Sequence, residues 1–322
     1  MPLSLAMSNT FNLPNKDKAM HHLLNNEANT FDTVQLNKNL VVFSALKEFY
    51  HTVKSQGFAI RYVVDGTEHY RLNGCDYPVG AGQYLLSNAT SEGFVAVESS
   101  KKVNGICLNI MPELLADVAA TVRRPDTPYV DMDLGLFFSS NLFLENIYNT
   151  HHTQLGKCLF DLNIALQKEP LHQKELTIEF FYLLCEKLIA DQIPVFKQLQ
   201  TIPSIKAATK KDLLRRILKA KDYIDSVFIE SLTIETVAKE VCLSEYHFFR
   251  LFKSVLGLSP HQYILKKRLE YAQNILKSDK NAVSFAAYES GFADIHAFSK
   301  AFKKHFGYAP SGLLGRKDLR NF

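Results

Sequence analysis

The segment EYHFFRLFKSVLGLSP (245–260) is repeated fifty residues later as IHAFSKAFKKHFGYAP (295–310), and this repeat indicates how the C-terminal part folds. Each copy follows a shorter helix-like stretch, IETVAKEV or SFAAYES, and a tight break at 241–243 or 291–293. A short helix, a brief turn and a second helix form the layout of a helix-turn-helix unit. Like residues are paired throughout the two copies: Phe248 with Phe298, Arg250 with Lys300, Phe252 with Phe302, Lys253 with Lys303, Gly257 with Gly307 and Pro260 with Pro310. The sequence therefore predicts two helix-turn-helix units.

Each second helix of the repeat begins with a side chain that can cap it. Ser244 and Asp294 can accept hydrogen bonds from backbone N–H groups two or three residues further on. The helical period turns these residues inward: Phe248, Leu251 and Phe252 in the first copy, and Phe298, Ala301 and Phe302 in the second. Because the first turn of a recognition helix usually points into the major groove, we expect the caps and the outward residues to bind DNA. These predicted DNA-binding residues are Ser244, Glu245, Tyr246, Phe249, Arg250 and Lys253 in the first unit, and Asp294, Ile295, His296, Ser299, Lys300 and Lys303 in the second.

The outward residues carry side chains that can read DNA. Arg250 can bind the O6 and N7 atoms of guanine or neutralise a phosphate, and lysine does the latter. Phe249 and Ile295 can contact thymine methyl groups, with burial of Phe249 against a neighbouring helix as an equal alternative. Glu245 fits the positive end of its helix better than it fits a contact with cytosine. The alternative interpretation of the repeat is two similar helical hairpins in an ordinary bundle. Such a bundle would not need outward Arg and Lys at matching positions, which argues against it.

The charge of the chain is divided unevenly between its two parts. The 322 residues carry a net charge of +4, but residues 210–322 hold 20 Lys and Arg against 12 Asp and Glu, a balance of +8. Residues 1–209 hold the remaining 17 and 21, a balance of −4. This asymmetry suggests that the C-terminal part alone meets a polyanion.

Two further features of the sequence bear on location. No apolar run reaches the roughly 18 to 20 residues needed to span a bilayer, and the first residues, MPLSLAMSNTFNLPNKDK, lack the pattern of a secretion signal. Five scattered cysteines without C-x-x-C spacing suit reduced thiols rather than a disulfide framework or a zinc site. We therefore expect a cytoplasmic protein that has no contact with a membrane.

The N-terminal part changes from strand-like to helix-like patterns. Residues 57–110 form short apolar runs, such as FAIRYVV, divided by Asp-Gly and Asn-Gly turns, which is typical of an antiparallel sandwich or small barrel. The first 40 residues are polar and are expected to form an arm or a loose first strand. Helical length and apolar spacing then mark 112–122, 142–168 and 175–193.

The predicted fold class is α+β with two domains. Residues 1–193 form the first domain, which is β-rich to about 110 and helical from about 112. Residues 194–210 contain two prolines and no sustained periodicity, which predicts a linker. Residues 211–322 form an all-α domain with the two helix-turn-helix units.

The C-terminal part of the sequence resembles a known family. SLTIETVAKEVCLSEYHFFRLFKSVLGLSPHQYILKKRLEYAQNIL, followed by VSFAAYESGFADIHAFSKAFKKHFGYAPS, resembles the DNA-binding domain of the AraC/XylS regulators. The matching elements are RLFK (250–253), Gly257 with Pro260, Tyr263-Ile264, Arg268-Leu269, Ala272, Gly291-Phe292 and FKKHFG (302–307) with Pro310. The resemblance covers about 211–315. It implies two units joined by a long helix, about 260–277, that insert into successive major grooves on one face of DNA.

Two positions depart from this family's pattern. Cys242 stands where the first turn usually has glycine, from which we expect that this turn needs no positive φ. Ala293 stands where the second turn usually has a small hydroxyl residue, while Asp294 can still cap the helix that follows. We expect both turns to fold despite these changes.

The resemblance extends less specifically to the N-terminal part. Family members often carry an N-terminal barrel of cupin type that binds an effector or dimerises, and residues 57–110 fit that layout. Cupin enzymes hold a metal with an H-x-H pair, whereas His69 stands alone here, so we expect no metal and no cofactor. The adjacent histidines at 21–22 and 151–152 are expected to be solvated, and the sequence does not identify the effector-binding residues.

The leading hypothesis is a sequence-specific transcription regulator, expected to be an activator. Its expected partners are double-stranded promoter or operator DNA, RNA polymerase, a small-molecule effector and a second copy of the chain. The alternative is a cupin-type enzyme, metal-free or metal-dependent, fused to a DNA-binding module. Neither a metal motif nor a nucleophile-and-base arrangement supports it, and a DNA-repair methyltransferase would need clustered cysteines. We therefore predict no catalytic residues.

Overall fold

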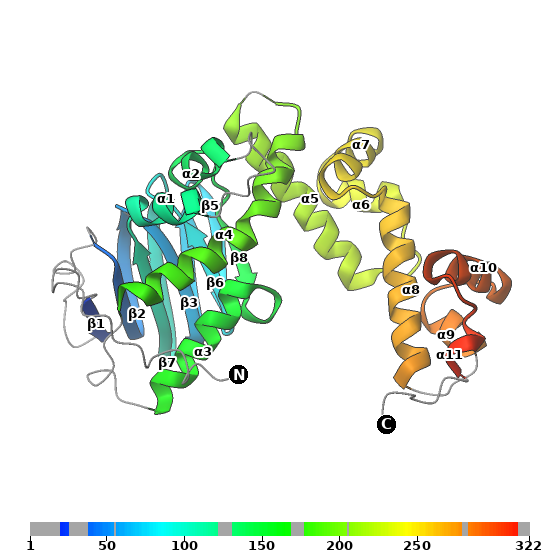
Figure 1. Ribbon diagram of the computed structural model, residues 1–322, viewed down its shortest axis with the longest axis horizontal. Helices are drawn as coiled ribbons and strands as arrows, with labels where there is room; N and C mark the ends of the chain where they lie inside the picture. The colour runs from blue at the N-terminus through cyan, green and yellow to red at the C-terminus, as the bar shows by residue number, and fades with distance from the viewer. Residues whose placement is uncertain are drawn as a thin grey trace. The chain divides into compact units, whose positions relative to one another are not determined.

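The computed structural model of the chain describes residues 20–25, 38–54, 56–121, 131–168, 177–204, 206–278 and 283–314. It divides into two compact units, Met1–Phe196 and Lys197–Phe322 (Figure 1). The described part of the first unit combines a curved sheet with helices, and that of the second is helical. The predicted α+β class is therefore confirmed.

One sheet runs through the first unit. Its strands are β1 (Met20–Asn25), β2 (Leu40–Lys54), β3 (Phe58–Asp65), β4 (Thr67–Leu72), β5 (Cys75–Gly80), β6 (Gln83–Ser87), β7 (Glu92–Ile110) and β8 (Asn146–Asn149). The pairing is antiparallel as predicted, except that β1 runs parallel to β2.

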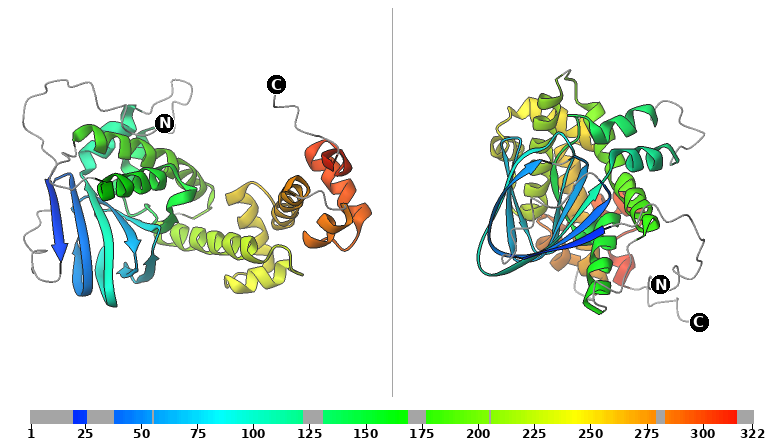
Figure 2. Two further views of the ribbon diagram at one scale, coloured as in Figure 1. Left: turned by 90° about the horizontal axis from the view of Figure 1, so that it is seen from below. Right: turned by 90° about the vertical axis from the view of Figure 1, so that its left-hand side faces the viewer.

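The long strands β2 and β7 curl this sheet into a nearly closed barrel. They pair from Leu40 opposite Asn109 to Lys54 opposite Glu92, with a register shift between Leu46 and Glu48. The first half of β7 also pairs with β4, and its second half pairs with β3. The sheet therefore folds over along β7, and Figure 2 shows the resulting curvature.

Strand β3 is buried on both of its faces, which explains its almost continuous apolar sequence. Every residue from Phe58 to Val63 is buried. Phe58 packs edge-on against Phe138, with ring centroids 5.8 Å apart, on the helix side of the sheet. Arg61 lies opposite Cys107 in the register and lines the barrel interior with it. The wall of the barrel thus separates an apolar outer layer from an inner cavity.

Helices cover the outer face of the sheet (Figures 1 and 2). They are α1 (Pro112–Thr121), α2 (Asp131–Ser139), the 3-10 turn η3 (Thr150–His152), α3 (Gln154–Lys168) and α4 (Ile178–Thr201). The prediction of one helix over 142–168 was wrong at its start. Residues 146–149 instead form β8 on the edge of β6, where the Tyr148 ring stacks on Tyr84 with centroids 5.5 Å apart.

The predicted linker at 194–210 was also too long. Helix α4 continues through Pro194 to Thr201, and the next helix begins at Ala207, which leaves 202–206 between them. The side chains of Val195, Phe196 and Leu199 are buried. This burial holds the helix together beyond a proline that removes one backbone hydrogen bond.

The second unit contains the two predicted helix-turn-helix units. Its helices are α5 (Ala207–Val227), α6 (Ile234–Glu240), α7 (Glu245–Leu256), α8 (Pro260–Ser278), α9 (Val283–Glu289), α10 (Ile295–Phe306) and α11 (Ser311–Leu314). The pairs α6–α7 and α9–α10 are the two units, and α8 is the long helix between them. The predicted inward phenylalanines of α7 and α10 are all buried, and Ala301 is half-buried.

Candidate nucleic-acid interface and barrel cavity

The two helix-turn-helix turns are built alike, around one residue with positive φ. Cys242 has a φ of 52° and Gly291 a φ of 80°. After each residue the next N–H returns to the carbonyl five positions earlier, from Leu243 to Ala238 and from Phe292 to Ala287, both at 3.0 Å. This pattern is a Schellman motif, which requires a left-handed residue at the end of the helix. The expectation that the turn at Cys242 needs no positive φ was therefore wrong.

An arginine from a long helix braces each of these turns. Arg216 Nη1 in α5 donates to the Cys242 carbonyl oxygen at 3.0 Å. Arg268 Nη1 in α8 donates to the Gly291 carbonyl oxygen at 2.9 Å. Arg268 also donates to the carbonyl oxygens of Phe228, at 2.6 Å, and Glu230, at 2.7 Å. These bonds fix the angle at which α7 and α10 leave their turns.

The second turn is one residue longer than the first. Ser244 follows Cys242 by two positions, whereas Asp294 follows Gly291 by three, so Ala293 is the additional residue. Both capping predictions are confirmed. Ser244 Oγ accepts from the His247 N–H at 3.4 Å, and the Asp294 carboxylate accepts from the N–H groups of His296 and Ala297 at 3.1 and 2.8 Å. The two backbone bonds to Asp294 lower the pKa of its carboxyl group.

The predicted DNA-binding residues lie on accessible faces of α7 and α10. Ser299 is half-buried and the other eleven side chains are exposed, Tyr246 to 71%. Phe249 is 36% exposed, so its neighbours cover most of its ring. Arg250 lies over the Tyr246 ring, with its Cζ 5.6 Å from the ring centroid, and donates to the Tyr246 hydroxyl at 3.4 Å.

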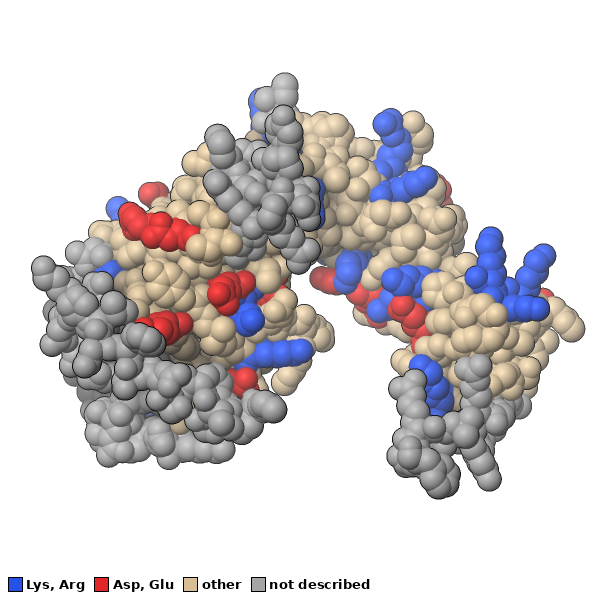
Figure 3. All heavy atoms as spheres, in the orientation of Figure 1, with Lys and Arg blue, Asp and Glu red and all other residues tan. Residues whose placement is uncertain are grey.

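Four cations on α7 and α10 differ from several lysines elsewhere in the unit. Lys219, Lys221, Lys239 and Lys267 pair with carboxylates at 2.7 to 3.1 Å. Within the part of the chain that the structure describes, Arg250, Lys253, Lys300 and Lys303 form no ion pair. In Figure 3, Lys and Arg side chains project together from the regions of α7 and α10. This face is therefore available to an external anion.

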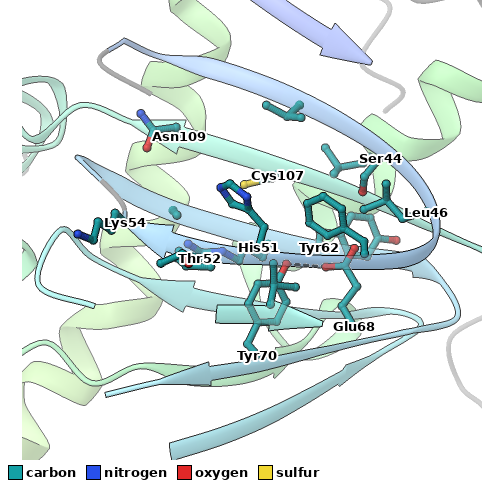
Figure 4. Close-up of a pocket in the computed structure, with 17 residues that line it drawn as sticks. Ser44, Leu46, His51, Thr52, Lys54, Tyr62, Glu68, Tyr70, Cys107 and Asn109 are labelled. Carbon is teal, nitrogen blue, oxygen red and sulfur yellow. Dashed lines mark hydrogen bonds between the residues drawn. The ribbon is translucent and has the colours of Figure 1, made fainter. Parts of the chain in front are cut away.

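The barrel of the first unit encloses a cavity of about 490 Å³. The apolar part of its lining is Val42, Leu46, Phe49, Val53, Ala59, Tyr62, Val95 and Ile106. The polar part is Ser44, His51, Thr52, Lys54, Arg61, Glu68, Tyr70, Cys107 and Asn109. Figure 4 shows Glu68 and Tyr70 side by side, joined by their hydrogen bond, with His51 and Cys107 above them.

The polar residues at one end of the cavity hold each other in place. The Tyr70 hydroxyl donates to Glu68 Oε2 at 2.5 Å, and Arg61 Cζ lies 5.3 Å from the Tyr70 ring centroid. Arg61 Nη1 donates to the Ser87 hydroxyl. Burial raises the pKa of Glu68, although its hydrogen bond from Tyr70 and the charge of Arg61 oppose this rise. A Cβ at position 105 would lie 2.8 Å from Glu68 Oε1, so Gly105 makes room for this group.

Two family models match the chain. The model described as the AraC-like ligand binding domain matches residues 48–184, which include most of the barrel and its helices. The model described as a helix-turn-helix domain matches residues 237–316. The chain belongs to the AraC family of transcription regulators.

Individual AraC-family relatives match the chain over different lengths. The Msm operon regulatory protein of Streptococcus mutans is 35% identical over 103 residues, which are 32% of this chain and 36% of that protein. AlkR of Acinetobacter baylyi is 21% identical, over 87% of this chain and 95% of its own. The solved C-terminal domain of AraT from Geobacillus stearothermophilus is 30% identical, covers 33% of this chain and 90% of its own, and gives a TM-score of 0.31. The chain spans 36% to 38% of the length of the first curated relatives that it matches.

Some features of this AraC-family chain could not be found from the sequence. The cavity residues come from four strands and have no common motif, although a charged Arg61 inside the apolar run FAIRYVV indicates an interior polar site. His69, His151 and His152 are exposed. The side chains of the histidines at 21 and 22 lie outside the described residues. In the described part, no three His, Cys, Asp or Glu side chains form a potential metal site, and no helix has the length and apolarity to cross a membrane.

Proposed function

We propose that this AraC-family protein is a sequence-specific transcription regulator that binds double-stranded DNA with α7 and α10. The observation that carries the proposal is the set of four cations without ion pairs at equivalent positions of two capped helices. Exposed Lys and Arg without acidic partners are the groups that neutralise phosphates and read guanine. The repeat brings these groups to the same helical positions in both units.

The twelve predicted DNA-binding residues of α7, α10 and their caps would make different kinds of contact with DNA. Arg250, whose guanidinium lies over the Tyr246 ring, would read a base. Phosphate contacts would fall to Lys300, which is equivalent to Arg250 in the repeat, and to Lys253 and Lys303, three residues further along their helices. Ile295, which is 38% exposed at the start of α10, suits a thymine methyl group.

The wider assignment extends this proposal to the whole chain. Residues 1–193 would sense a small molecule in the barrel cavity, and residues 211–322 would bind DNA in the cytoplasm. A second copy of the chain and RNA polymerase are the proposed protein partners, and activation is the proposed outcome. A relative named lactose operon transcription activator, from Staphylococcus xylosus, supports activation.

The salt dependence of DNA binding tests the proposal. The probe is a 40-base-pair duplex selected from a randomised pool with the parent protein. We expect log Kd to change steeply with log salt, and Arg250→Ala or Lys300→Ala to weaken binding about 5- to 150-fold because each removes about 1–3 kcal/mol. Each lost phosphate contact should also reduce the slope by about 0.9.

The matched control is Lys277→Ala at the end of α8, where the lysine is exposed but donates to Gln273 at 3.0 Å. This variant should bind the duplex like the parent. Unchanged affinity in both the Arg250→Ala and the Lys300→Ala variant would refute the assignment of α7 and α10 as DNA-reading helices.

A further inference from the structure

The barrel cavity holds a cation that the protein itself satisfies incompletely. The Arg61 side chain is only 6% exposed and lines the cavity. Of its five N–H donors, one is used within the described residues, in the hydrogen bond from Nη1 to Ser87. A buried charge is costly unless it is paired and hydrogen-bonded. The remaining donors of Arg61 therefore favour an acceptor that comes from outside the chain.

The nearby carboxylate of Glu68 is not the acceptor for these remaining donors of Arg61. Glu68 is 5% exposed and attracts Arg61, but the two side chains form no ion pair within 4.0 Å. Glu68 Oε2 accepts a hydrogen bond from the Tyr70 hydroxyl. The Tyr70 ring covers one side of the guanidinium at 5.3 Å. Glu68 and Tyr70 therefore position Arg61 and leave its free edge to a ligand.

The rest of the cavity lining indicates the charge, the polarity and the size of the ligand. Lys54 also stands on the cavity wall, so the two cationic groups Arg61 and Lys54 outnumber the single carboxylate of Glu68. Most of the remaining lining is apolar, with Leu46, Val53 and Val95 buried in the barrel core. A cavity of about 490 Å³ lies within the ordinary range of sites for small organic ligands.

We infer that the effector is a small monocarboxylic acid whose carboxylate binds Arg61 and whose apolar body fills the barrel between β2, β3, β4 and β7. Arginine suits this role because its planar fork can donate two parallel hydrogen bonds to one carboxylate. The apolar body covers the valine and leucine side chains, which a polyhydroxylated sugar would leave facing hydroxyl groups. This inference rests on the proposed function, since it names the class of molecule that the barrel would sense.

Binding of matched acids and alcohols to the full chain tests the inference. The probes are octanoate, decanoate and 2-naphthoate, each compared by calorimetry with the alcohol of the same skeleton. At least one acid should bind the parent at least tenfold more tightly than its alcohol. Arg61→Gln should remove this preference, and Arg61→Lys should restore part of it by returning the charge.

Arg71→Gln is the matched control. Arg71 lies on β4 with its side chain 54% exposed and pairs with Asp76, so this variant should bind acids like the parent. Equal affinity of acids and alcohols, binding of neither, or an unchanged preference in Arg61→Gln would overturn the inference. If Arg61→Gln does not fold, as judged by thermal unfolding without ligand, the Arg61→Lys variant and the acid-to-alcohol ratio of the parent decide the question.

DNA binding of the same variants separates this inference from the proposed function. Arg61→Gln without any acid should bind the selected duplex like the parent, because Arg61 lies in the barrel. Intact DNA binding with no preference for acids would overturn the ligand class and leave the regulator assignment standing. Loss of DNA binding in the parent itself would overturn the proposed function.

Discussion

At the scale of single residues, Cys242 and Gly291 perform the same backbone task with different side chains. Both have positive φ and both end a helix of a helix-turn-helix unit. A Cβ at Gly291 would approach the Ile229 carbonyl oxygen to 2.5 Å and Arg268 Cζ to 3.2 Å, so this position also needs space. Cys242 is exposed and has room for its side chain. The repeat therefore tolerates a cysteine in its first turn and requires glycine in its second.

Substitutions at Cys242 and Gly291 should change the free energy of unfolding in opposite directions. Cys242→Gly should raise the free energy of unfolding by about 1 kcal/mol, because left-handed backbone costs an L-residue about 1–2 kcal/mol and glycine returns part of this as entropy. Gly291→Ala should lower it by at least about 2 kcal/mol, since the backbone penalty and the contact with Ile229 add. Urea unfolding of the full chain measures both. A loss of stability in Cys242→Gly would contradict the account of the first turn.

At the scale of elements, α5 and α8 are tied together by one carboxylate. Asp225 in α5 accepts from the Tyr263 hydroxyl at 2.9 Å and pairs with Lys267 at 3.1 Å, both in α8, and with Lys221 at 2.9 Å. Burial acts to raise the pKa of Asp225, but the hydrogen bonds from Lys221, Lys267 and Tyr263 outweigh it, so the pKa is lowered. The same two helices supply the arginines that brace the turns. Their junction therefore fixes how α7 and α10 are presented.

Asp225→Asn should destabilise the chain by about 1–2 kcal/mol at neutral pH, a figure reduced for partial exposure of the pairs. Because the folded pKa of Asp225 is lowered, its contribution is complete above the ordinary pKa of 3.8 and is lost as pH falls through the folded pKa. The difference between parent and variant should therefore persist at about pH 4 and disappear only at lower pH, where the folded carboxyl group becomes protonated. Urea unfolding over a pH series measures it.

Asp222 supplies the control for this measurement. It lies in the same helix, its side chain is 77% exposed, and burial is the first cause of its raised pKa. Asp222→Asn should leave stability at neutral pH unchanged or slightly higher. A similar loss in both variants would show that the effect belongs to helix propensity rather than to the bonds of Asp225.

Elements also differ in how far the sequence could predict them. The starts of α7 and α10 and their buried faces were predicted, because the caps and the inward phenylalanines are local signals. The segment 146–149 was not, because its strand exists only through pairing with β6. Pro194 indicated a break, but burial of the residues that follow kept α4 intact. The cavity was missed for a related reason, since long-range register alone brings Arg61 and Glu68 together.

At the scale of the whole molecule, the charge asymmetry in the sequence coincides with the division into two units. The basic excess of 210–322 falls in the unit that carries α7 and α10, whose exposed Arg250, Lys253, Lys300 and Lys303 have no acidic partner among the described residues. The first unit instead holds its buried charges in a cavity lined largely by apolar groups. The chain thus combines a surface for a polyanion with an interior site for a small molecule.

Hydroxyl-radical footprinting of the selected duplex tests the central claim, that two equivalent helices of one chain read neighbouring major grooves. For each bound copy we expect two protected patches on one face of the DNA, about ten base pairs apart. Arg250→Ala should weaken one patch and Lys300→Ala the other. A single patch, patches on opposite faces of the duplex, or loss of the same patch in both variants would contradict the claim.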